Sequence, residues 1–132
     1  MNDPNGPVHW QGTYHLFFQA NPDAPIWGPP RWGHVSSEDL VTWRRHRIAL
    51  EPSRGGPDQD GCWSGCTRVV AGRPVIYYTG VVGDGVQRVE SVCRAFGSDD
   101  LMRWDKDPDN PLIPGPPPAL GSGYHRDPFL WQ

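Results

Sequence analysis

The sequence lacks features that would place it in several classes of protein. It contains no block of acidic residues, and its richest basic stretch is RRHR at 44–47. Nucleic-acid-binding domains display clustered Lys and Arg, so this short stretch indicates a solvated strand end or loop. No apolar run approaches the ~20 residues of a membrane-spanning helix. The sequence therefore predicts no nucleic-acid partner and no membrane span.

Cysteine is also scarce, with residues at positions 62, 66 and 93 only. In a strand, Cys62 and Cys66 would lie ~13 Å apart, beyond the ~7 Å limit between the Cα atoms of a disulfide. Cys93 alone does not complete a zinc site. We expect buried free thiols, no metal and no cofactor. No signal peptide is recognised ahead of the first motif, and the sequence leaves the compartment open.

Glycine and proline, by contrast, are abundant, with 16 of each among 132 residues. Such a composition suits a disordered chain, but seven Trp, four Tyr and four Phe are too many large rings for a chain without a core. No stretch keeps a helical period over a useful length. Short aromatic-rich strands separated by tight turns therefore predict an all-β domain.

The chain repeats itself after about 60 residues. SEDLVTW at 37–43 matches SDDLMRW at 98–104, and WQGTYHLFF at 10–18 parallels VAGRPVIYY at 70–78. Each copy predicts four strands, with the Asp-Leu segment as a turn between the third and the fourth. Trp43 and Trp104 lead the fourth strands and are expected to pack in the core. Four-stranded modules in tandem favour a β-propeller, the alternative being a β-sandwich with two similar hairpins.

Two acidic residues occupy equivalent positions in this repeat. Asp3 of NDPNG, Ser64 of CWSG and Asp127 of HRDP follow one another at intervals of 61 and 63 residues. Taken alone, an Asp-Pro pair is typical of a turn. In a propeller, however, the innermost strand of every blade begins beside the central channel. We therefore expect Asp3 and Asp127 to face one another across one funnel.

As a set, MNDPNG, HLFFQANP, WGHVSSEDLVTW, GCWSGCT and HRDP resemble the signature segments of the β-fructofuranosidases. These glycoside hydrolases include invertases, levanases, inulinases and sucrose-phosphate hydrolases. The resemblance covers nearly the whole chain and implies a five-bladed propeller with a funnel-shaped site. Blade one would cover about 1–60, blade two about 61–122, and the first strand of a third blade 123–132. The implied reaction is the cleavage of terminal β-fructosides, such as sucrose or fructans, with retention.

The resemblance also assigns roles to individual residues. Asp3 would be the nucleophile, and Asp127 would stabilise the transition state by holding fructose hydroxyls. The family's sugar-binding positions fall on Asn2, Gln19, Trp27, Trp63, Ser64 and Arg126. These residue types suit the reaction, because an ionised carboxylate can attack the anomeric carbon. Flat indole rings pack against the C–H faces of a sugar.

One part of the family pattern is absent from the sequence. The general acid is a Glu, usually followed by Cys, in a segment after RDP, and Glu38, Glu51 and Glu90 stand in no such context. We therefore expect this chain to be a piece of a longer enzyme and to be weakly active or inactive alone. Two other functions stay open: a sugar-binding propeller without catalysis, and a related hydrolase of arabinosides or xylosides.

Overall fold

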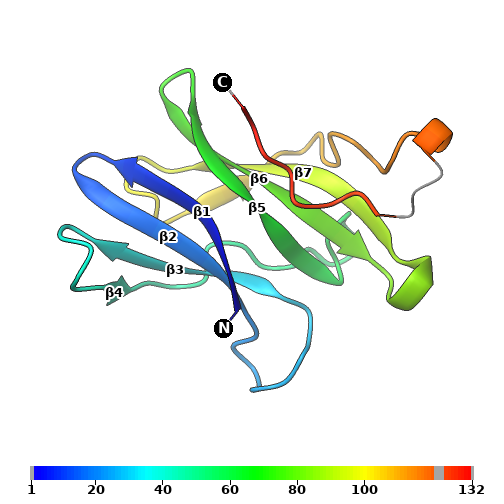
Figure 1. Cartoon of the computed structure of the whole chain (residues 1–132), viewed down its shortest axis with the longest axis horizontal. Helices are drawn as coiled ribbons and strands as arrows, with labels where there is room; N and C mark the ends of the chain where they lie inside the picture. The colour runs from blue at the N-terminus through cyan, green and yellow to red at the C-terminus, as the bar shows by residue number, and fades with distance from the viewer. Residues whose placement is uncertain (1, 121–123, 132) are drawn as a thin grey trace.

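Two four-stranded antiparallel sheets follow one another along the chain (Figure 1). This computed structural model describes residues 2–120 and 124–131. The first sheet contains β1 (Asn2–Trp10), β2 (Thr13–Ala20), β3 (Arg31–Ser37) and β4 (Arg44–Arg45). The second contains β5 (Gly61–Val70), β6 (Arg73–Val82), β7 (Val89–Gly97) and β8 (Trp104–Lys106). In each sheet the strands pair in sequence order, as in a propeller blade, which confirms the all-β prediction.

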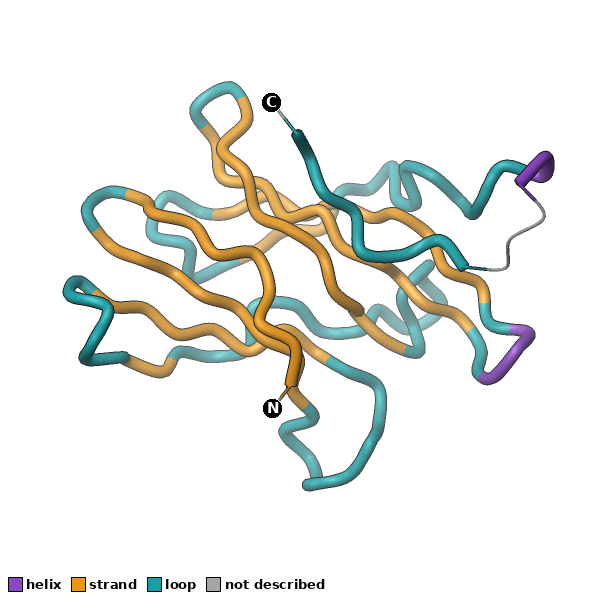
Figure 2. The backbone as a smooth tube through the Cα atoms, in the orientation of Figure 1, coloured by secondary structure: helices purple, strands orange, loops and turns teal. Residues whose placement is uncertain are grey.

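Helical structure is limited to two short 3₁₀ turns in the described part of the chain, drawn in purple in Figure 2. They are η1 (Gly85–Gln87) and η2 (Pro118–Leu120). No helix among the described residues is therefore long and apolar enough to cross a membrane.

The repeat in the sequence is also a repeat of backbone conformation. The β1–β2 hairpin turns at Gln11 and Gly12, with φ of 48° and 82°, and the β5–β6 hairpin turns at Ala71 and Gly72, with φ of 49° and 75°. Positive φ at both central residues belongs to the type I′ turn, whose twist matches that of the strands it joins. Both hairpins are therefore closed by the same two-residue turn.

The predicted Asp-Leu turns connect the third strand of each sheet to the fourth. In the first, Ser37 Oγ donates to Asp39 Oδ1 at 2.9 Å, and the same oxygen accepts from the N–H groups two and three residues on. These backbone hydrogen bonds, followed by that of Ser37, lower the pKa of Asp39 to about 2. Ser98 and Asp100 repeat the side-chain contact at 2.7 Å. The turn interpretation of both segments is confirmed.

The core lies between the two sheets. It contains Phe17, Trp32, Leu50, Cys62, Ile76, Tyr78, Cys93, Ala95, Leu101 and Trp104. Trp104 packs edge-on against Phe17, with ring centroids 5.5 Å apart, and is 8% exposed. Its counterpart Trp43 is 39% exposed, so the prediction of a core position for Trp43 was wrong. The reason is that Trp104 is covered by the preceding sheet, whereas no described sheet precedes β1. All three cysteines are free and buried, as expected.

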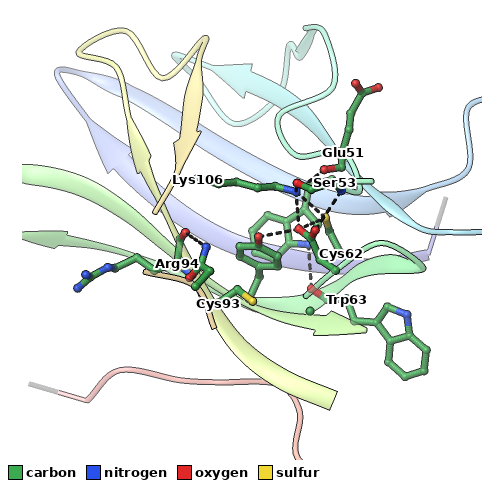
Figure 3. Close-up of polar contacts among 12 residues, drawn as sticks. Glu51, Ser53, Cys62, Trp63, Cys93, Arg94 and Lys106 are labelled. Atoms are coloured by element: carbon green, nitrogen blue, oxygen red, sulfur yellow. Dashed lines mark hydrogen bonds and ion pairs between the residues drawn. The ribbon is translucent and has the colours of Figure 1, made fainter. Parts of the chain in front are cut away.

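A buried ion pair fastens the connection between the sheets to β8 (Figure 3). Asp58 is fully buried and accepts hydrogen bonds from the Tyr78 hydroxyl at 2.7 Å and the Ser53 N–H at 3.0 Å. Its charge is balanced by Lys106, whose ammonium also donates to Ser53 Oγ at 2.8 Å. Burial raises the pKa of Asp58, but the contacts with Lys106 and Tyr78 outweigh it, and the pKa lies below its usual value.

Residues 124–131 run along the second sheet without joining it. In Figure 1 this red segment follows β5. Arg68 Nε donates to the Leu130 carbonyl at 3.0 Å, and the Leu130 N–H donates to Cys66 Sγ at 3.4 Å. The first strand of a third blade was expected here, although residues 123 and 132 lie outside the described residues. A strand needs a partner in its own sheet, and the described residues provide none, so the blade boundaries stay a prediction.

Candidate active site

Asp3 and Ser64 each lie at a β-bulge. The register of β1 against β2 shifts at Asp3, and that of β5 against β6 shifts at Ser64. A bulge re-aims one side chain and is common beside active sites. Here the two side chains approach one another across the sheets, since Ser64 Oγ donates to Asp3 Oδ2 at 3.4 Å. Asp3 and Ser64, which are equivalent in the sequence repeat, therefore both lie at a bulge.

A hollow of about 440 Å³ opens between the start of β1, the bulge of β5 and the segment after residue 124. It is lined by Asp3, Pro4, Asn5, Ser64, Gly65, Asp127, Pro128 and Phe129. Asp3 and Asp127 therefore share one hollow despite their distance along the chain, and they are its only acidic residues in the part of the chain that the structure describes. Its volume suits a small ligand.

A chain of polar contacts leads from Asn2 to this hollow. Asn2 Nδ2 donates to Gln19 Oε1 at 3.2 Å, and Gln19 Nε2 donates to Ser64 Oγ at 2.8 Å. Gln19 is only 4% exposed, so its amide is held in place from both ends. Three of the predicted sugar-binding residues thus form one hydrogen-bonded group that ends at Asp3.

The predicted aromatic residues Trp27 and Trp63 are not among the residues that line the hollow of the two carboxylates. Trp27 meets Trp63 edge-on, with centroids 6.1 Å apart, and is 71% exposed. Both line a neighbouring hollow of about 470 Å³ together with Arg88. The guanidinium groups of Arg88 and Arg126 lie 5.2 and 6.0 Å from the Trp63 ring centre. Trp27 also borders a third hollow with Asn2.

Asp127 has an unusual backbone. Its φ is 59°, in the left-handed region that few non-glycine residues adopt and that Asp adopts more often than most. Its N–H donates to Thr79 Oγ1 at 2.8 Å, and Thr79 Oγ1 in turn donates to the Ser64 carbonyl at 3.1 Å. Arg126 lies between two carboxylates, 3.9 Å from Asp127 Oδ2 and 3.5 Å from Glu90 Oε1.

Sequence reasoning missed three polar residues at this site. Thr79 is described above, and Glu90, 1% exposed, accepts from Arg88 Nε and from the His125 N–H, both at 2.7 Å. Asn5 is 3% exposed, and its Nδ2 has no hydrogen-bond partner among the described residues. The repeat contained a signal for Thr79, which follows Gln19 by 60 residues.

Three histidines lie together in the first sheet, outside this site. His15 Nδ1 and His34 Nε2 are 2.9 Å apart, and the His34 ring lies 4.6 Å from the rings of Phe17 and His46. Burial, followed by the charges of His46 and His15, lowers the pKa of His34 to about 3. No group of three or more His, Cys, Asp or Glu is placed to hold a metal ion in the described ranges 2–120 and 124–131.

One family model matches the whole chain. Residues 1–132 correspond to the glycosyl hydrolases family 32 N-terminal domain. Beta-fructofuranosidase 1 of Zea mays is 44% identical over 131 residues, which are 97% of this chain and 19% of the maize protein. A fructan 1-exohydrolase of Triticum urartu is 43% identical over 133 residues, 97% of this chain and 22% of the wheat protein. The chain spans about a fifth of these relatives.

Solved structures show the same similarity. A mutant of a β-fructofuranosidase from Bombyx mori, in complex with sucrose, matches 100% of this chain and 27% of its own, with a TM-score of 0.86 and 36% identity. Fructan 1-exohydrolase IIa from Cichorium intybus matches 96% of this chain and 23% of its own, with a TM-score of 0.79 and 38% identity. The family model, the relatives and the two propeller-type sheets agree with the resemblance seen in the sequence, and the chain belongs to the N-terminal domain of the family 32 glycosyl hydrolases.

Proposed function

We propose that the chain forms the first two blades of a retaining β-fructofuranosidase that cleaves terminal β-fructosides such as sucrose or fructans. The observation that carries this proposal is the single hollow lined by Asp3, Ser64 and Asp127. The substrate class is supported by relatives, since the silkworm enzyme was solved with sucrose and a chicory fructan 1-exohydrolase with 1-kestose.

The chemistry begins at Asp3. Its carboxylate attacks the anomeric carbon of the fructosyl group while the bond to the leaving oxygen breaks and a carboxylic acid protonates that oxygen. The acid, now a carboxylate, then takes a proton from water, whose oxygen attacks the same carbon and releases Asp3. The described lining of the hollow contains no third acidic residue. We propose that the acid comes from a part of the longer enzyme outside these 132 residues.

The other predicted residues bind and orient the sugar. Asp127 accepts hydrogen bonds from neighbouring fructose hydroxyls, and such charge-assisted bonds are about twice as strong as neutral ones. Gln19 holds the Ser64 hydroxyl toward Asp3 through its 2.8 Å contact. The indole rings of Trp27 and Trp63, which meet edge-on, pack against the C–H faces of the substrate. Asn2, which donates to Gln19, and Arg126, which lies beside Asp127, supply the remaining polar contacts to the sugar.

The test uses the full-length enzyme that contains this chain. Asp3→Asn should lower kcat for sucrose by roughly 10⁴-fold or more, as removal of a member of a catalytic group does. Asp105→Asn is the matched control, because this exposed carboxylate lies on β8 in a surface ion pair with Arg103. Activity of Asp3→Asn close to that of the control would show that Asp3 is not the nucleophile.

Three further measurements separate the competing functions. NMR of the first product should show β-fructose, as retention requires. Sucrose binding without turnover by the full-length protein would instead indicate a sugar-binding propeller, and turnover of nitrophenyl arabinosides would indicate the related hydrolases. The isolated 132-residue chain should be weakly active or inactive, and turnover near that of the full-length enzyme would contradict the proposed division of the site.

A further inference from the structure

Two side chains of the second sheet fasten the segment that carries Asp127. Thr79 on β6 accepts the Asp127 N–H at 2.8 Å, and Glu90 on β7 accepts the His125 N–H at 2.7 Å. Thr79 is 0% exposed and Glu90 is 1% exposed, so neither side chain is open to a ligand in the hollow. Their contacts are directed at the backbone around the carboxylate and leave its side chain free.

The first sheet fastens β5 at the equivalent places. Gln19, 60 residues before Thr79, donates to Ser64 Oγ at 2.8 Å. Pro30, 60 residues before Glu90, accepts the Cys62 N–H through its carbonyl at 2.9 Å. The same two positions therefore hold the next inner segment in both repeats, with different chemical groups. Gln19 and Thr79 hold Ser64 and Asp127, which line the hollow. Pro30 and Glu90 hold the residues two positions earlier, Cys62 and His125.

The backbone of Asp127 explains why such fastening matters. Its φ of 59° lies in the left-handed region, which most side chains disfavour, although Asp tolerates it better than most, so contacts that fix the backbone there help to hold it. The bond to Thr79 does so directly, and Thr79 is itself fixed by its 3.1 Å bond to the Ser64 carbonyl. A single hydroxyl thus connects the backbone of Ser64 to that of Asp127.

Glu90 also places a buried negative charge next to two arginines. Its carboxylate pairs with Arg88 at 2.7 Å and with Arg126 at 3.5 Å. Without it, two guanidinium groups would stand beside Trp63 with no buried counter-charge, and Arg126 would be drawn to Asp127, 3.9 Å away. Glu90 and Asp127 thus share the Arg126 guanidinium, and Glu90 Oε1 is the nearer acceptor.

We propose that Thr79 and Glu90 are positioning residues, which hold residues 125–127 so that Asp127 faces Asp3 across the hollow. The inference rests on the proposed function, because it assigns their effect to transition-state stabilisation by Asp127. Neither residue touches the sugar.

The main test compares two Thr79 variants in the full-length enzyme. Thr79→Val keeps the shape but loses the hydroxyl, and it should lower kcat and kcat/KM for sucrose together by about 10- to 100-fold, with KM nearly constant. Thr79→Ser keeps the hydroxyl and should restore kcat to within about fivefold of wild type. Hydrogen exchange followed by mass spectrometry should show faster exchange of the peptide covering 124–131 in Thr79→Val only.

Thr67→Val is the matched control. Thr67 is a buried threonine on the adjacent strand β5, and its hydroxyl has no hydrogen-bond partner among the described residues. Its replacement should leave both kcat and the 124–131 exchange at wild-type values. Glu90→Gln keeps an acceptor for the His125 N–H but loses the charge, so it should lower kcat with little change in exchange.

The outcomes separate this inference from the proposed function. Wild-type enzyme without β-fructoside turnover would mean that the proposed function fails. With an active wild type, Thr79→Val within twofold of the wild-type kcat would overturn the positioning role, whatever the exchange shows. Unchanged hydrogen exchange of the 124–131 peptide in Thr79→Val would show that Thr79 does not hold this segment. A kcat loss in Thr67→Val equal to that in Thr79→Val would assign the effect to core packing and overturn the inference as well.

Discussion

Acidification should destabilise the first sheet through His34. This ring is 1% exposed and is packed against Phe17 and His46, with its Nε2 2.9 Å from His15 Nδ1. Burial first, and then the charges of His46 and His15, lowers its pKa to about 3. In the unfolded chain the same group titrates near 6.5. The unfolded state therefore binds more protons between these values, and stability is lost as the pH falls below about 6.5.

The size of the effect follows from the difference in pKa. Each pH unit below the unfolded value costs about 1.4 kcal/mol, so about pH 5 should cost ~2 kcal/mol relative to about pH 8. The loss should approach ~5 kcal/mol near pH 3, where His34 itself becomes protonated in the folded state. Burial also lowers the pKa of His15 and of His46, which adds to the loss in the same direction.

Urea unfolding followed by tryptophan fluorescence at about pH 8, 6.5 and 5 measures this loss. His34→Gln keeps a hydrogen-bonding group but does not titrate, so its stability should fall ~2 kcal/mol less than that of the wild type over this range. His9→Gln, which removes an exposed histidine of β1, should behave as the wild type. An equal decline in the wild type and in His34→Gln would refute the reasoning, and NMR titration of the imidazoles gives the pKa directly.

Three other changes give separable results. Lys106→Met leaves the buried Asp58 carboxylate without its cation and should lower the free energy of unfolding by ~3–5 kcal/mol in urea titrations; a loss under ~1 kcal/mol would contradict this. Gly65→Ala would place a Cβ 2.0 Å from the Tyr77 carbonyl oxygen, so circular dichroism should show loss of strand structure, and a native spectrum would disprove the clash. Trp27→Ala removes a ring that is 71% exposed, so it should leave stability within ~0.5 kcal/mol while raising KM for sucrose in the full-length enzyme. An unchanged KM would remove Trp27 from the substrate contacts.

The sequence predicted the two sheets and the placement of Asp3 and Asp127 beside one hollow, because both follow from the repeat. Once equivalent positions are known, propeller geometry brings them to one channel without further information. The bulges at Asp3 and Ser64 were not predicted, since a register shift of one residue depends on how the paired strand aligns and leaves no distinct mark in composition.

The remaining misses concern contacts between distant segments. Trp43 and Trp104 stand in the same motif, yet only Trp104 is buried, because burial depends on which sheet covers the motif. Thr79 and Glu90 have ordinary neighbours in the sequence, and their partners lie 48 and 35 residues away, respectively. The repeat points to Thr79 as the equivalent of Gln19, but only the tertiary structure shows which groups Thr79 and Glu90 bind.

Two hydrogen bonds hold successive inner segments: Cys62 N–H to Pro30 in the first and His125 N–H to Glu90 in the second. Mutation can break the second more readily than the first. At the first, the acceptor is the main-chain oxygen of Pro30, which every replacement residue would also possess. At the second, the acceptor is the side chain of Glu90, which a single codon change can abolish. Natural variation that displaces an inner segment should therefore arise more readily at position 90, which holds the Asp127 segment, than at position 30, which holds β5.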